Sequence, residues 1–173
     1  MKKIVLTLTF LLAACTVASA QYSTENLRGL QGVRLVVMFG RADGLPEEQR
    51  PELLKTLTAE ATTKLQNAGI RLLKWAGESE AAGFPQLEIR ITLDKLNGFV
   101  HPLVTEVQLL QRVKLVRDFT IEEDAITWRL EGVGGPTLEI PMIHRQVAGI
   151  LDRFISDYFS VNPRQTAGST EKN

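Results

Sequence analysis

The alternating stretch between residues 87 and 93 constrains the fold more than any other part of the sequence. Its odd positions are apolar and its even positions carry charged or hydroxyl side chains: Leu87, Ile89, Ile91 and Leu93 against Glu88, Arg90 and Thr92. Because successive side chains of a β-strand point to opposite faces, this pattern predicts a strand with one buried face and one solvated face. Such a strand requires neighbouring strands and a second layer over its apolar side.

Two amphipathic helices are predicted to supply that second layer. The first follows Pro46, and Pro51 favours a start near residue 50; Gly69 suits its C-terminal cap. Its apolar stripe recurs every four residues at Leu53, Leu57, Ala61 and Leu65. The second helix has the same 3.6-residue period, with Ile143, Val147, Ile150, Leu151, Phe154 and Tyr158 on one side. Each helix therefore has one apolar face for a core.

Four further apolar stretches read as strands: 33–39, 70–75, 103–117 and 125–131. The turn signal Asn97-Gly98 joins the alternating strand to the long stretch after it. The predicted fold is α+β: a two-layer sandwich with a mostly antiparallel sheet of about five strands and two helices packed on one face. We expect a single domain over residues 21–161 and a disordered polar tail over 162–173.

The N-terminus has the pattern of a signal peptide over residues 1–20. Lys2 and Lys3 precede an uncharged apolar stretch that is too short to span a bilayer, and Ala18-Ser19-Ala20 is a small-x-small cleavage site. The stretch ending at Cys15, Leu-Ala-Ala-Cys, also resembles a lipobox, which makes Cys15 the candidate lipidation residue. We therefore expect a periplasmic or secreted protein, with a membrane-anchored lipoprotein as the alternative.

Composition limits the classes of partner. Removing residues 1–20 takes two lysines and no acids from the 20 basic and 20 acidic residues, so the mature net charge is −2. This charge argues against a nucleic-acid partner, which requires a basic excess. We expect contact with a membrane only through a lipid on Cys15. Because Cys15 is the one cysteine, the predicted mature domain has no disulfide.

The sequence carries no recognisable catalytic or metal-binding constellation. The two histidines, His101 and His144, lack metal-ligand spacing, and the chain has no nucleophile elbow. The glycine run 132–135 lacks the lysine of a phosphate-binding loop. We therefore expect no catalytic, cofactor-binding or metal-binding residues and no enzyme activity. The alternative is a periplasmic small-ligand carrier or a hydrolase that uses the open-face groups Glu88, Glu106 and Arg90.

The sheet face away from the helices is the predicted partner surface. Alternation places an unusual number of apolar residues there, together with two basic ones, and the residues we assign to this surface are Val36, Met38, Leu110, Arg112 and Lys114. Clustered apolar residues on an exposed face mark interaction sites. Burial by loops or by dimerisation is an equally good interpretation of the apolar ones. The expected partner is an envelope protein or a second copy of the chain.

Several segments carry a resemblance in layout to known proteins: LRGLQGVRLVVMF, LQNAGIRLL, VQLLQRVKLVRD, AITWRL and FISDYFSVNP. With the order of elements, they resemble uncharacterised bacterial secreted proteins and the lipopolysaccharide-assembly lipoprotein with related envelope αβ-sandwich lipoproteins. The resemblance spans most of the mature chain and implies an envelope binding module without catalytic activity. It assigns no role to any residue. The predicted function is thus a non-catalytic extracytoplasmic binding or assembly module acting through protein–protein contact.

Overall fold

The computed structural model describes residues 23–74, 83–96, 99–134 and 139–164. The helices are α1 (Arg50–Ala68) and α2 (Ile140–Val161), with short 3₁₀ helices η1 (Thr24–Leu27) and η2 (Glu47–Gln49). The strands are β1 (Arg34–Ala42), β2 (Gln86–Leu96), β3 (Phe99–Leu115) and β4 (Asp118–Val133). The predicted signal peptide 1–20 with Cys15, the Asn97-Gly98 turn and residues 165–173 of the predicted tail lie outside the described residues.

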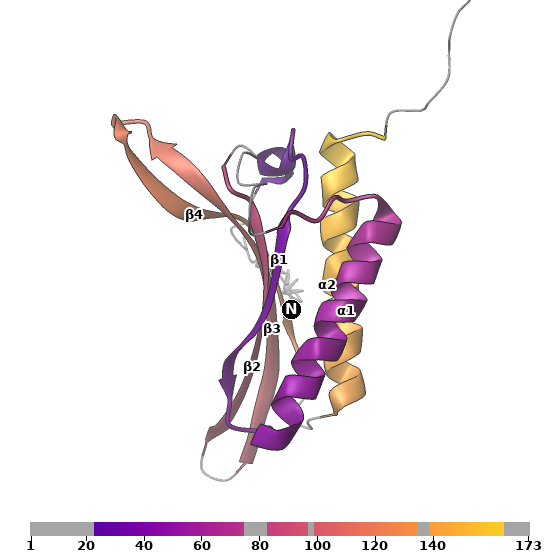
Figure 1. Ribbon diagram of the computed structural model, residues 1–173. Helices are drawn as coiled ribbons and strands as arrows, with labels where there is room; N and C mark the ends of the chain where they lie inside the picture. The colour runs from indigo at the N-terminus through magenta and orange to yellow at the C-terminus, as the bar shows by residue number, and fades with distance from the viewer. Residues whose placement is uncertain (1–22, 75–82, 97–98, 135–138, 165–173) are drawn as a thin grey trace, which may run out of the picture.

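The fold is α+β with two layers, as the sequence predicts. The strands lie in the order β1-β2-β3-β4, and both helices pack on one face of this sheet (Figure 1). α1 packs against β1 and against α2, and α2 packs against β3 and β4. Among the described residues, no helix is both long and apolar enough to cross a membrane.

Two details of the predicted sheet are wrong. Among the described residues the sheet has four strands, because the described part of the predicted strand 70–75, residues 70–74, contributes only one bridge, between Leu72 and Val33. The sheet is also mixed rather than mostly antiparallel. β1 runs parallel to β2, since α1 carries the chain back between them, whereas β2, β3 and β4 pair antiparallel. A parallel neighbour requires such a crossover connection, and the helix between residues 50 and 68 provides it.

The core lies between the sheet and the helices. The predicted stripe of α1 and most of that of α2 are buried there, and the odd positions of the alternating strand, from Leu87 to Leu93, are at most 1 % exposed. Trp128 of β4 meets Phe154 of α2 edge to face, with ring centroids 5.1 Å apart. The Trp128 indole N–H donates to Asp157, which satisfies the one polar group that this ring brings into the core.

The ends of the helices follow from local chemistry. α1 begins at Arg50, whose guanidinium donates to the carbonyls of Ala42 and Leu45 and so ties the helix to the end of β1. Gly69 ends α1 in the left-handed conformation, at φ 87°, as predicted. At the end of α2, Asn162 accepts from the backbone N–H of Gly29 and donates to the carbonyl of Leu27.

β1 is one edge of the sheet. At its start, Val33 donates to the carbonyl of Arg71 and accepts from the N–H of Leu73, both at 2.9 Å. Within the described part of the chain, no other segment pairs with the outer side of β1. The strand between Arg34 and Arg41 contains no charged residue, and its side chains from Leu35 to Phe39 are half-buried or exposed.

Candidate functional site

The open face of the sheet carries a ladder of charged and amide side chains. Glu88 on β2 is 6 % exposed and accepts from Arg90 at 2.6 and 3.0 Å and from Gln108 of β3 at 3.0 Å. Farther across the sheet, Arg129 of β4 pairs with Glu106 at 2.9 Å. Buried carboxylates of this kind persist because charge-assisted hydrogen bonds replace their water.

This ladder contains all three groups of the predicted carrier or hydrolase. The structure brings Glu88 and Arg90 into direct contact and pairs Glu106 with Arg129 instead. None of the three groups lines the small pocket at the start of β2. Their contacts are those of a cross-strand structural network, in which each carboxylate already has a cationic partner.

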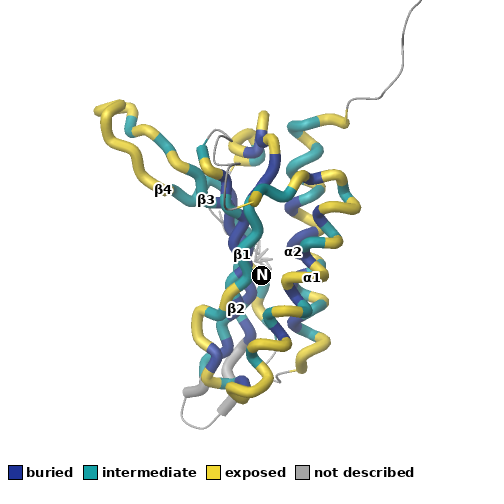
Figure 2. Tube along the Cα trace, viewed as in Figure 1, coloured by how far each residue is buried: buried dark blue, intermediate teal, exposed yellow. Residues whose placement is uncertain are grey.

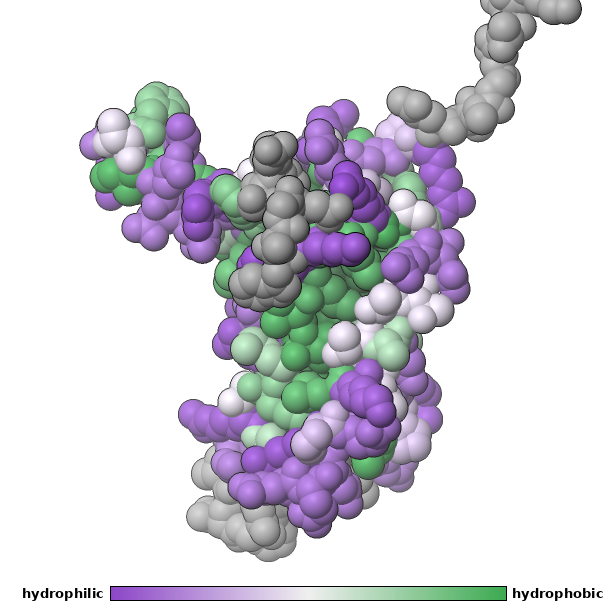
Figure 3. Space-filling model, in the orientation of Figure 1, coloured by the Kyte–Doolittle hydropathy of each residue, from purple (hydrophilic) through white to green (hydrophobic). Residues whose placement is uncertain are grey.

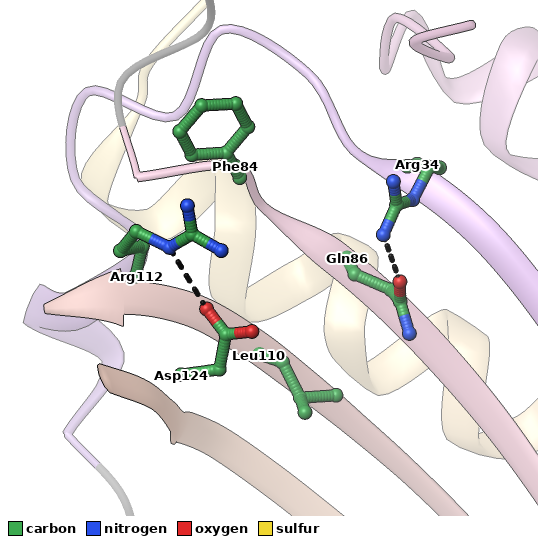
Figure 4. Close-up of a pocket in the computed structure, with 6 residues that line it drawn as sticks. All are labelled: Arg34, Phe84, Gln86, Leu110, Arg112 and Asp124. Atoms are coloured by element: carbon green, nitrogen blue, oxygen red, sulfur yellow. Dashed lines mark hydrogen bonds and ion pairs between the residues drawn. The ribbon is translucent and has the colours of Figure 1, made fainter. Parts of the chain in front are cut away.

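A small pocket lies where the open face meets the start of β2. It encloses about 130 Å³ and is lined by Arg34, Phe84, Gln86, Leu110, Arg112 and Asp124 (Figure 4). Arg112 donates to Asp124 at 3.2 Å, and its guanidinium lies 4.8 Å from the centre of the Phe84 ring. Arg34 donates to the amide oxygen of Gln86. Pockets that hold small organic ligands enclose about 300–1,000 Å³, so this one is well below that range.

Phe84 is held in this pocket by a strained backbone. Its φ is 44°, a left-handed value that a bulky side chain rarely adopts. The residues on either side are fixed: the carbonyl of Gly83 accepts from the N–H of Arg112 at 2.7 Å, and that of Pro85 accepts from Arg34 at 2.9 Å. The segment 83–85 thus connects β3 to β1 through these two backbone hydrogen bonds.

β3 and β4 continue beyond the sheet as a two-stranded arm. β2 begins opposite Leu110, so beyond the end of β2 residues 111–125 pair with one another, and the Arg112 N–H also donates to the carbonyl of Gly83. We call these residues the β3–β4 arm. In Figures 1 and 2 it projects away from the helices, at the upper left, and most of it is exposed.

The two sides of the arm differ in character. One side carries the ion pairs Arg112–Asp124 at 3.2 Å and Lys114–Glu122 at 3.3 Å. Near the tip, apolar side chains are exposed: Val116 (84 %), Phe119 (65 %) and Ile121 (36 %). The register shifts between Lys114 and Leu115, which places residues 119–121 in a bulge that presents side chains irregularly.

Asp118 shapes this tip. Its carboxylate accepts from both the backbone N–H and the hydroxyl of Thr120, at 3.0 and 2.6 Å. These two hydrogen bonds, that of the hydroxyl foremost, hold the pKa of Asp118 below its usual value. The local bonds fold the chain back on itself beside Phe119, so that the aromatic ring is carried on a defined turn.

The predicted partner surface is divided between three places. Val36 and Met38 lie on β1, where they pair with Glu88 and Arg90 of β2. Leu110 lines the pocket, and Arg112 and Lys114 lie on the charged side of the arm. The ladder residues of β2 separate the apolar side chains of β1 from Leu110, so the structure does not bring the five residues into one patch.

The arm tip and Phe84 escaped the sequence interpretation. One signal was present: the predicted fourth strand, 103–117, is more than twice as long as its predicted partner, 87–93. The residues of strand 103–117 that extend beyond this partner must leave the sheet or pair with another segment. That pairing occurs at the acidic run 122–124, opposite the basic residues of β3.

The described residues contain no group of three or more side chains placed to hold a metal ion. His144 pairs with Glu60 at 2.7 Å, which joins α2 to α1. The contact is one bridge between helices, beside the Lys64–Asp152 pair at 2.7 Å.

No family model matches this chain, and no curated protein matches its sequence. One similar solved structure is the rare lipoprotein B from Shewanella oneidensis. It is 13 % identical, with a TM-score of 0.26, and the alignment covers 75 % of this chain and 96 % of that one. A likeness at this level carries no argument about function.

Proposed function

We propose that this protein is a non-catalytic binding module of the cell envelope that holds a partner protein through its β3–β4 arm. The observation that carries the proposal is the exposed apolar tip, where Val116, Phe119 and Ile121 stand on a ribbon that no described element covers. A two-stranded ribbon has marginal stability alone, and apolar side chains at its end add nothing to the core. A partner that covers them gains their burial.

The charged side of the arm indicates what kind of partner fits. Arg112 and Lys114 are paired with Asp124 and Glu122 within the arm, so they need no opposite charge from outside. The arm therefore suits a protein with an apolar recess deep enough for the tip, rather than an acidic or basic surface. An envelope protein is the partner class, because the signal-peptide pattern of residues 1–20 directs the chain out of the cytoplasm.

The non-catalytic part of the proposal is supported by the open face. Its carboxylates, Glu88 and Glu106, are engaged by Arg90, Gln108 and Arg129, and neither lines the 130 Å³ pocket. A hydrolytic carboxylate pair needs access to substrate and to water in a shared cleft. The carrier and hydrolase alternative therefore has less support than the binding module.

Site-specific cross-linking in the native host tests the proposal. A photoreactive residue at Val116 should give a discrete adduct with one envelope protein, and Phe119→Asp should lower its yield about tenfold, because a buried aromatic contributes about 1.5–3 kcal/mol. Val133→Asp is the matched control, since Val133 is also 65 % exposed but lies at the other end of β4.

The control variant should leave the yield unchanged. The thermal midpoint of both variants should stay near that of the parent protein, because neither side chain contributes to the core. An equal loss of adduct in the two variants, or a photoreactive residue at Val116 that captures nothing, would contradict the proposal.

A further inference from the structure

The outer side of β1 presents backbone hydrogen-bonding groups at alternate residues, and from Leu35 onward no described segment pairs with them. Val33 directs its N–H and carbonyl outward, to Arg71 and Leu73, whereas the N–H of Arg34 points inward to Pro85. The register with β2 is continuous from Arg34 to Phe39, so this alternation persists along the strand. Leu35, Val37 and Phe39 therefore direct their N–H and carbonyl groups outward, where no described segment meets them.

The side chains of this edge are apolar on both faces. Leu35, Val37 and Phe39 are half-buried against the core on the helix side, and Val36 and Met38 lie on the open side. Figure 3 shows the result: apolar surface gathers between the sheet and the helices. Exposed sheet edges in native proteins are usually guarded by lysine, proline or an inward-pointing charge, and residues 35–40 contain none of these.

The neighbouring flank of α1 is also uncharged. The flank toward α2 is fixed by the pairs Glu60–His144 and Lys64–Asp152. By the 100° rotation per residue, Leu54, Thr58 and Thr62 lie on the opposite flank, above the β1 edge. Edge and flank together form one uncharged face, which we call the β1–α1 face.

We propose that the β1–α1 face binds a second copy of this chain, with the two β1 strands pairing antiparallel into a continuous eight-stranded sheet. The strand matches itself about Val37: Leu35 of one copy lies opposite Phe39 of the other, and Val37 opposite Val37. All three of these residues have outward groups, so the pairing forms six backbone hydrogen bonds between the copies. It places no charge opposite a like charge between Leu35 and Phe39.

The structure also limits the register. The segment Arg71–Leu73 already occupies the outer side of Val33, and the pairing of β1 with β2 shifts register between Phe39 and Ala42, so the regular alternation of outward groups ends at Phe39. A partner strand therefore fits only from Leu35 to Phe39. The centre of that stretch is Val37, which places the twofold axis there.

The size of the face favours a copy of the chain over an isolated peptide. α1 has 19 residues and is about 28 Å long, and a strand plus a helix layer is about 20 Å deep. A second copy covers both layers, about 600 Å² on each side by this geometry, near the lower limit for a specific interface. A bound peptide would cover the strand and leave the uncharged flank of α1 exposed. We expect a dimer with micromolar affinity.

Sedimentation velocity on the purified exported protein, from about 1 to 100 μM, tests the pairing. The weight-average mass should rise from one chain to two across this range. Met38→Lys places two cations near the axis and should keep the protein monomeric at every concentration. Met38 is 36 % exposed, so an unchanged thermal midpoint will show that the variant is folded. Val133→Lys, on the other edge of the sheet, should dimerise as the parent does.

A cysteine at the axis tests the register itself. Under mild oxidation Val37→Cys should form a disulfide-linked dimer, since Cα atoms of a hydrogen-bonded antiparallel pair lie about 5.5 Å apart. Val133→Cys, which is more exposed, should not form one. A protein that stays monomeric at 100 μM, or a dimer that survives Met38→Lys, would overturn the proposal. A cross-link equally fast at Val133 would do the same.

Discussion

Replacing Glu88 by alanine should destabilise the protein by about 2–3 kcal/mol. Two losses make up this figure. The amide of Gln108 is 4 % exposed and loses its acceptor, which costs about 1–3 kcal/mol for an unsatisfied buried donor. Arg90 also loses its carboxylate, but its side chain is 42 % exposed and can be rehydrated, so this part adds about 1 kcal/mol or less.

Glu88→Gln separates the two contributions. The glutamine keeps an oxygen for Gln108 and loses only the charge that faces Arg90, so it should cost about 1 kcal/mol. Urea denaturation at neutral pH measures both variants, and in a domain of this size about 3 kcal/mol lowers the thermal midpoint by about 6–12 °C.

The two variants should therefore differ clearly in their urea midpoints. A Glu88→Ala protein within about 0.5 kcal/mol of the parent would refute the structural role of this carboxylate. It would also revive the catalytic alternative, because functional groups are often held at a cost to stability.

Two further measurements test the backbone and the hydroxyl groups. In urea denaturation, Gly32→Ala should destabilise the protein by about 1–3 kcal/mol, because the added Cβ would lie 2.6 Å from the Arg71 carbonyl oxygen. Gly149→Ala should stabilise it by about 0.5–1 kcal/mol, because Gly149 lies on α2 with open space around it. Equal effects of the two variants would contradict both assignments. Burial raises the pKa of Tyr158, whose hydroxyl donates to Leu30, so the unfolded chain loses this proton first. Stability should fall as the pH rises beyond about 10 and Tyr158→Phe should remove this dependence, both followed by urea midpoints at alkaline pH.

The parts of the fold that local periodicity encodes were predictable. The stripe of α1, its end at Gly69 and the alternation from Leu87 to Leu93 are short-range patterns, and each appears in the structure where the sequence places it. Such patterns report which face of an element is buried, and two one-sided helices over one-sided strands allow few arrangements.

Pairing between distant strands was less predictable. Ile70 and the residues after it have the composition of a strand, yet Ile70 is buried at the end of α1 and only Leu72 meets β1. A strand exists only where a neighbour offers its edge, and the sequence of one segment does not contain that information. The residues 118–124 show the converse, since an acidic stretch without alternation becomes a strand because Arg112 and Lys114 lie opposite.

The candidate site was predictable only in its general location. Alternation placed Glu88 on the open face correctly, but the sequence interpretation treated it as solvated. The structure buries it, because Gln108 from β3 reaches it across the sheet. The exposure of Phe119 depends on β2 beginning opposite Leu110, which leaves the arm without a third strand. Both facts depend on strand register, which is a property of the assembled sheet.

The parallel pairing of β1 with β2 constrains the order in which the strands can pair during folding. β2, β3 and β4 follow one another along the chain, so their contacts close over short loops, whereas β1 must wait for Gln86, 52 residues beyond Arg34. Until β2 is available, the apolar run Leu-Val-Val-Met-Phe of β1 stays exposed to solvent in a chain that is still collapsing. Such a run is the kind of segment from which misassembly starts. When synthesis or export is slow, we expect this protein to depend on holdase chaperones. These chaperones would cover the segment until β2, β3 and β4 have paired with one another.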